Sequence, residues 1–154
     1  MDFQGLFREV RDKAFPEINS KFKQSDKIHF MRSSSITKNI YYNPKTIGEM
    51  KFPELAIKGV IAHELAHQVD FNARGGWFFR RLWDTYRCSK DEVYRRGFER
   101  KADAITAKRG FGNEYLEAMK LTKKKFSKDR WKRYEAAHLS IKEMKNLIKN
   151  TSTN

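Results

Sequence analysis

The chain has 154 residues, a length that suits one domain with a single hydrophobic core. Charged residues make up 34%, but 14% of the residues are aromatic, too many for a disordered polyelectrolyte. The lone cysteine, Cys88, excludes an internal disulfide and a cysteine-rich zinc finger. The most apolar stretch, 57–69, is interrupted by charged residues, and residues 1–13 lack the pattern of a secretory signal. We therefore expect a folded cytoplasmic domain without a transmembrane segment.

Positive charge is concentrated in one part of the chain. The formal net charge is +14, and residues 74–133 hold 19 Lys and Arg against 8 Asp and Glu. Such a field attracts polyanions, acidic proteins or anionic membrane surfaces. A solvated basic face that only keeps the protein soluble is the plainer interpretation. Nucleic acid therefore remains a partner that the basic stretch allows but does not favour.

The N-terminal half is expected to combine helices with short strands. Apolar residues at helical spacing predict an amphipathic helix over 2–14. Strands are expected at 27–32 and 40–42. Pro53 suits the first turn of a long helix that runs to about Asp70.

The C-terminal half is expected to be helical. One helix over 91–109 ends at Gly110, and a shorter one follows over 113–124. Ser140 and Glu143 form a capping box for the last helix. The fold class is therefore α+β, dominated by helix.

The domain boundaries follow from the same pattern. Residues 1–149 are expected to form a single domain, because no linker long enough to divide them is present. Residues 150–154 are expected to be a frayed tail.

Two of the four histidines lie in His63–Glu64–Leu65–Ala66–His67. Helix positions four apart share a face at about 5–6 Å, so both imidazoles can bind one metal ion at zinc–nitrogen distances of about 2.0–2.1 Å. Glu64 can reach a metal-bound water as a general base. This pattern predicts a zinc site, the alternative being two ordinary, partly buried histidines.

A catalytic zinc site needs a third protein ligand and one open position. Residues 68–72 contain no histidine, which excludes the metzincin class. Glu99 and Asp103 lie four apart, on one face of the next long helix. We expect Glu99 to bind zinc and Asp103 to accept the free N–H of a ligand histidine. The alternative is a surface pair of acids among neighbouring cations.

The segments 60–67 (VIAHELAH) and 98–103 (FERKAD) resemble the gluzincin metallopeptidases. They are most similar to the CAAX prenyl protease and heat-shock membrane protease group, and to the soluble minigluzincins. The resemblance runs from about Ile28 to Ile148. It implies a zincin-like domain with a short sheet, an active-site HExxH helix and a glutamate helix. It also implies one zinc ion and a peptide or protein substrate.

The resemblance implies three further assignments. Ile40, Tyr41 and Tyr42 correspond to an edge strand that pairs with an extended substrate. His138 corresponds to a histidine that polarises the scissile carbonyl or holds the developing oxyanion. Leu139 stands where the family has a proline.

The aromatic and basic stretch 75–96 is not explained by the family pattern. Its apolar residues recur at helical spacing, which favours burial in the core over a substrate wall. Cys88 is expected to be a free, partly buried thiol, not a thiolate that caps zinc. His29 is expected to face solvent. The apolar residues in question are Trp77, Phe78, Leu82, Trp83 and Tyr86.

Zinc-dependent hydrolysis of peptide bonds is the expected function. In it, Glu64 moves the proton of the attacking water, and zinc, helped by His138, stabilises the oxyanion. One alternative is a SprT-like zinc protease whose basic stretch docks on DNA. The other is a latent or non-catalytic zinc-binding domain, in which a terminal segment covers the cleft.

Overall fold

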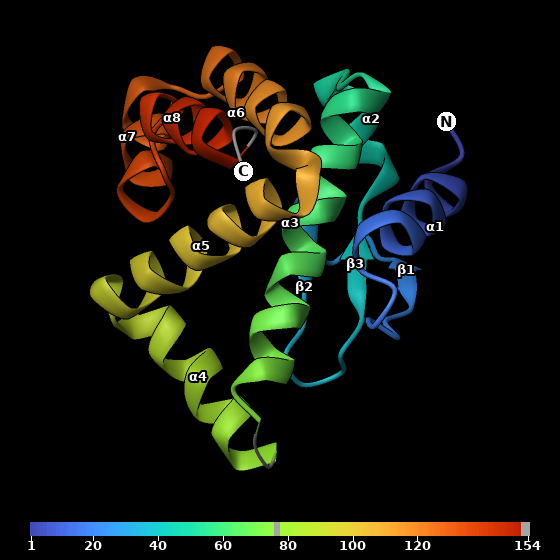
Figure 1. The fold of residues 1–154 in the computed structure, drawn as a ribbon, viewed down its shortest axis with the longest axis vertical. Coiled ribbons are helices and arrows are strands. Elements are labelled where there is room, and N and C mark those ends of the chain that lie inside the picture. Colours follow the sequence, from blue (N-terminus) through green and yellow to red (C-terminus); the bar gives the residue numbers. More distant parts are fainter. Residues whose placement is uncertain (76–77, 152–154) are drawn as a thin grey trace.

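The computed structural model describes residues 1–75 and 78–151. Helices surround a small three-stranded sheet (Figure 1), so the predicted α+β class with a helical majority is confirmed. None of the helices in the described part of the chain combines the length and hydrophobicity needed to cross a bilayer. The elements, in chain order, are α1 (Phe3–Ala14), β1 (Phe22–Gln24), β2 (Met31–Ser33), β3 (Ile40–Tyr42), α2 (Pro44–Met50), α3 (Glu54–Ala73), α4 (Phe78–Lys90), α5 (Glu92–Thr106), the π-helical segment η1 (Ala107–Phe111), α6 (Gly112–Lys125), α7 (Lys128–Ala137) and α8 (Ile141–Thr151).

Most of the predicted elements are present at the expected places. The helices α1, α3, α5, α6 and α8 and the strand β3 match the sequence pattern, whereas β1, α2 and α7 were not predicted. The strand expected at 27–32 is confined to its end, at Met31–Ser33. The capping box forms, because Ser140 and Glu143 exchange side-chain hydrogen bonds with each other's backbone N–H. The helix α8 reaches Thr151, so residues 150–151 are helical and not frayed; residues 152–154 lie outside the described residues.

The sheet has the order β1-β3-β2, so β3 is its central strand. It pairs with β1 in parallel and with β2 antiparallel. The prediction that Ile40, Tyr41 and Tyr42 form an edge strand for substrate was therefore wrong. The prediction failed because β1, which is only three residues long, was not recognised. This strand pairs with one side of β3, so neither side of β3 is open to a substrate.

The strand β2 provides the free edge. The C=O of Phe30 accepts a hydrogen bond from Asn43 N–H, and Ser34 N–H donates to the C=O of Asn39. In an antiparallel pair, alternate residues direct their backbone groups to opposite sides. The N–H and C=O groups of Met31 and Ser33 therefore point away from β3, along the open edge.

The helix α3 lies at the centre of the molecule, between the sheet with α1 on one side and α5 to α8 on the other (Figure 1). It is buried over most of its length. Its packing against α6 is unusually close at Gly59. A Cβ atom at this position would lie 2.3 Å from the backbone of Glu114 and Tyr115, so only glycine lets the two helices meet here.

The helix α4 contradicts the prediction that its aromatic residues belong to the core. None of its described residues is buried. Phe78, Leu82, Trp83 and Tyr86 are 55%, 38%, 60% and 55% exposed, respectively, and Trp77 lies outside the described residues. The reason is that the polar side of the helix, not its apolar side, attaches to the protein.

Candidate metal centre

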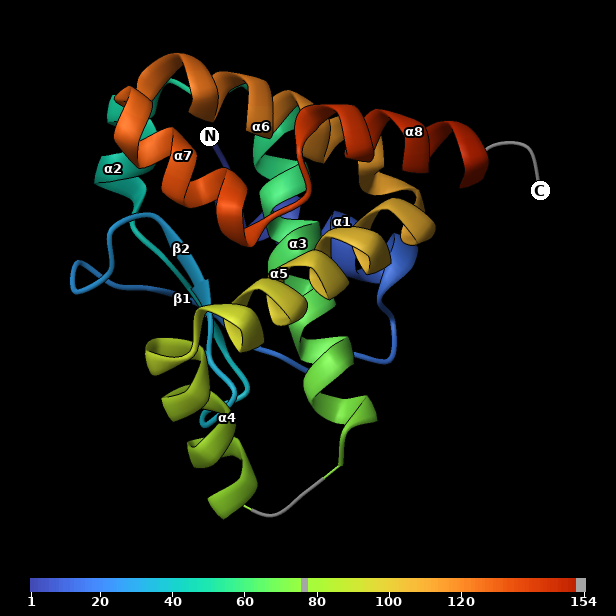
Figure 2. The same cartoon turned by 90° about the vertical axis from the view of Figure 1, so that its left-hand side faces the viewer.

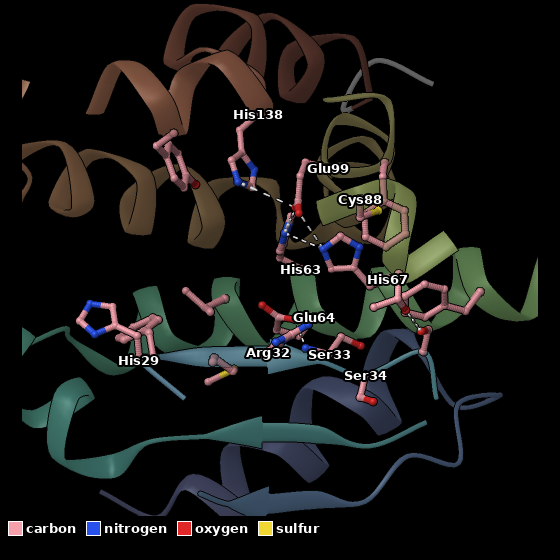
Figure 3. Close-up of a pocket in the computed structure, with 18 of the residues that line it drawn as sticks. His29, Arg32, Ser33, Ser34, His63, Glu64, His67, Cys88, Glu99 and His138 are labelled. Carbon is pink, nitrogen blue, oxygen red and sulfur yellow. Dashed lines mark hydrogen bonds and ion pairs between the residues drawn. The ribbon is translucent and has the colours of Figure 1, made fainter. Parts of the chain in front are cut away.

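The helices α3 and α5 bring His63, His67 and Glu99 together (Figure 3). His63 and His67 lie one helical turn apart on α3, and Glu99 reaches them from α5. The Nε2 atoms of the two histidines are 3.1 Å apart. Oε2 of Glu99 lies 3.3 Å from Nε2 of His63 and 3.2 Å from Nε2 of His67. Three potential ligand atoms therefore form a nearly equilateral triangle.

The size and chemistry of this triangle fit a zinc ion. Bonds of about 2.0–2.1 Å in a tetrahedral site place neighbouring ligand atoms about 3.3 Å apart. Two imidazoles and one carboxylate are a ligand set of catalytic zinc sites, and they leave a fourth position for water or substrate. The donor atoms of His63, His67 and Glu99 therefore fit the metal without rearrangement of the helices.

Aromatic neighbours hold both rings in place. The ring of His63 stacks on Tyr115, with a centroid distance of 4.7 Å and an interplanar angle of 7°. The ring of His67 stacks on Phe98 at 4.4 Å. Both histidines are 5% exposed. Their ring planes are thus set by packing from α5 and α6, and not by the helix α3 alone.

Asp103 lies on the far side of His63 from Glu99 and is fully buried. Its Oδ1 is 3.1 Å from Nδ1 of His63 and 3.3 Å from Nδ1 of His138. Its Oδ2 accepts a 2.7 Å hydrogen bond from Leu139 N–H. A proline at position 139 has no N–H and could not make this bond. The N–H of Leu139 therefore anchors the α7–α8 junction to α5.

The charges of the cluster shift the pKa values of its members. Burial disfavours the charged form of His63, but Asp103 and Glu99 outweigh burial and raise its pKa to about 10. Burial alone would raise the pKa of Glu99, yet His67 and His63 hold it well below its usual range. The metal-free site therefore keeps its carboxylates ionised next to a protonated imidazole, and a metal ion must displace that proton.

The side chain of Glu64 points to β2 (Figure 3), where its Oε2 accepts a hydrogen bond from Ser33 N–H. This N–H belongs to the free edge of the sheet. Gln68 supports the same strand, because its Nε2 donates to Ser33 Oγ and, at 3.1 Å, to the C=O of Ser34. Sequence reasoning missed Gln68. An amide inside an otherwise apolar helical stretch was the signal, since a buried amide needs a partner.

His63, His67 and Glu99 open into a cleft of about 680 Å³. It is lined by β2 with its flanking residues, by Met50 of α2 and by residues of α3 to α7. His138 lines it, with Nε2 3.8 Å from Oε2 of Glu99. His29 lies at its far end and is exposed, as expected. Cys88 lies in the wall as a half-buried free thiol. Burial raises the pKa of Cys88 to about 11, so the thiol is neutral at ordinary pH.

Among the described residues, neither α1 nor α8 contributes a side chain to the cleft, and β3 contributes none either. The structure therefore brings together His63, Glu64, His67, Glu99, Asp103 and His138, but leaves Ile40, Tyr41 and Tyr42 away from the cleft. Comparison of the chain with protein-family models, with curated proteins and with solved structures found no match.

Proposed function

We propose that this protein is a zinc-dependent metallopeptidase of the gluzincin type. The observation that carries the proposal is the position of Oε2 of Glu99, within 3.3 Å of Nε2 of both His63 and His67. Glu99 follows the histidines by more than thirty residues in the chain. A chance surface acid would not be largely buried against two imidazoles at ligand spacing, with its side chain only 22% exposed.

His63, His67 and Glu99 would hold the zinc ion. When bound there, zinc supplies a Lewis acid that polarises a carbonyl group and lowers the pKa of water to about 7. Glu64 lies next to the histidines in the cleft wall and takes a proton from the attacking water. The same carboxyl group then gives this proton to the leaving amine. Its hydrogen bond with Ser33 N–H keeps Glu64 on the cleft side of α3.

Two further groups act on the substrate. The free edge of β2 offers the backbone N–H and C=O of Met31 to an extended peptide, which would add to the sheet as a further strand. His138 lines the cleft with its Nε2 towards Glu99, from where it can donate a hydrogen bond to the oxygen of the carbonyl under attack. Asp103 holds the other ring nitrogen of His138.

Metal analysis combined with peptide hydrolysis tests this function. Glu64→Gln should retain one zinc per chain and lose turnover, whereas Glu99→Ala should lose both. Glu92→Ala, an exposed acid on the same helix, is the matched control and should retain both. Stoichiometric zinc in Glu99→Ala would show that the ligand assignment is wrong. Stoichiometric zinc in the native protein without hydrolysis of any peptide in a mixed-sequence library would favour the non-catalytic alternative.

A further inference from the structure

The helix α4 attaches to the protein by its polar side. The hydroxyl groups of Thr85 and Ser35 lie 2.8 Å apart, and Arg81 Nη1 donates to the C=O of Ser35 at 3.3 Å. On the next turn, the hydroxyl of Tyr94 on α5 donates to Oδ1 of Asp84 at 2.6 Å. Polar side chains of α4 therefore make the contacts that an amphipathic helix normally makes with its apolar face.

The apolar side of α4 faces away from these contacts, and two of its residues, Leu82 and Tyr86, also line the cleft. At about 100° per residue, its five large apolar residues lie on an arc of about 140°. Their side chains are between 38% and 75% exposed. A contiguous exposed patch of this kind marks an interaction site more often than a plain surface. This outer face of α4 consists of Phe78, Phe79, Leu82, Trp83 and Tyr86.

The charges that border the outer face are mainly positive, although Arg87 pairs with Asp91 at 3.0 Å. Arg80 and Arg87 follow Trp83 around the helix, and Lys90 lies at its C-terminal end. The sole acid of α4, Asp84, lies on the attached side, where it binds Tyr94. Arg80 and Lys90 are exposed and make no ion pair within residues 1–75 and 78–151. A partner for this face must therefore combine an apolar interior with negative charge at its boundary.

We propose that the outer face of α4 binds the surface of an anionic lipid bilayer. Tryptophan, tyrosine and phenylalanine favour the boundary between headgroups and acyl chains. Arginine and lysine at that depth meet the anionic headgroups, each contributing a favourable attraction. The helix lies at one end of the molecule, outside the packed core (Figure 2), where a flat surface can reach it. The proposal does not depend on the zinc chemistry.

Two other partners fit this surface less well. Single-stranded nucleic acid is bound by aromatic rings set along a cationic groove, whereas the apolar residues of α4 lie along the ridge of a helix with the cations at its border. A second copy of the chain would bring like charges together, because Arg80 and Lys90 would face the same residues of the other copy. Charge complementarity therefore favours the anionic bilayer.

Vesicle flotation tests the proposal. The native protein should float with vesicles made of equal parts of phosphatidylcholine and phosphatidylglycerol, and at least about tenfold less with phosphatidylcholine alone. The double variant Phe79→Ser with Trp83→Ser should reduce binding to the mixed vesicles by at least about tenfold. Leu55→Ser is the matched control, because Leu55 is 52% exposed on α3 and its loss should change nothing. Circular dichroism checks that each variant is folded.

Several results would overturn the proposal. Absence of flotation with the mixed vesicles would do so, as would equal flotation of the folded double variant and the native protein. A dimer in sedimentation that the double variant abolishes, without vesicle binding, would assign the face to a second copy. Binding of single-stranded DNA under the conditions in which vesicles fail would assign it to nucleic acid.

Discussion

Oδ1 of Asp103 lies 3.1 Å from Nδ1 of His63, on the side of the ring opposite Nε2, which faces His67 and Glu99. A carboxylate in this position fixes the ring orientation and makes Nε2 a better metal ligand. The same Asp103 accepts the N–H of Leu139. One buried side chain therefore links the proposed zinc ligand to the junction that carries His138.

Asp103→Asn tests this link. The amide keeps the size of the side chain but removes its charge and one of its two acceptor atoms. We expect zinc affinity to fall about 10- to 100-fold, measured by competition with a chelator of known affinity. Asp26→Asn, in an exposed loop, should leave the affinity unchanged. An unchanged affinity in Asp103→Asn would show that the carboxylate has no effect on the ligand.

Gln68→Met tests whether Gln68 positions β2. The substitution keeps the volume but removes the donor to Ser33 and Ser34, and leaves the half-buried C=O of Ser34 without this partner. We expect kcat/KM for peptides to fall by about an order of magnitude, with zinc content unchanged, because Ser33 N–H and Glu64 are no longer held together. Gln24→Met, at the exposed end of β1, is the control. An unchanged kcat/KM in Gln68→Met would show that Gln68 does not position β2 for catalysis.

Gly59→Ala tests the close packing of α3 on α6. The added Cβ would meet backbone atoms of Glu114 and Tyr115 at 2.3 to 2.5 Å, which a side-chain movement cannot relieve. We expect the free energy of unfolding to fall by about 3 kcal/mol or more, measured by urea denaturation.

Gly97→Ala is the matched helical glycine for that experiment. Nothing lies within 4 Å of a Cβ added at Gly97, so alanine should raise the free energy of unfolding by about 0.5–1 kcal/mol. Equal effects at Gly59 and Gly97 would contradict the close approach of the two helices.

The reactivity of Cys88 gives a test of its pKa. Burial raises this pKa to about 11, so the reactive thiolate is scarce at neutral pH. Alkylation by iodoacetamide at pH 7 should be about two orders of magnitude slower than for an unperturbed thiol with a pKa of about 8.5. The rate should then rise about tenfold per pH unit without levelling off below pH 10. A plateau near pH 8.5 would contradict the effect of burial.

Local patterns predicted those features that a single helix determines. The spacing of His63 and His67, and of Glu99 and Asp103, follows from the helical repeat. Such patterns did not reveal β1, whose three residues are too short for a strand signal. That omission misplaced the edge of the sheet, and with it the surface assigned to an extended substrate. Gln68 was missed because its partners, Ser33 and Ser34, lie more than thirty residues away.

The sequence by itself determined the helical class, the capping box at Ser140 and the pairing of ligand residues within each helix, because these depend on neighbours within a few positions. Tertiary structure alone decided that α5 brings Glu99 within 3.3 Å of α3, that β2 is the open edge, and that α4 turns its aromatic side to the solvent. Amphipathic spacing shows that a helix has two faces. Which face is covered depends on contacts with distant segments. In α4, the hydrogen bonds of Thr85 with Ser35 and of Asp84 with Tyr94 cover the polar face and leave the apolar face exposed.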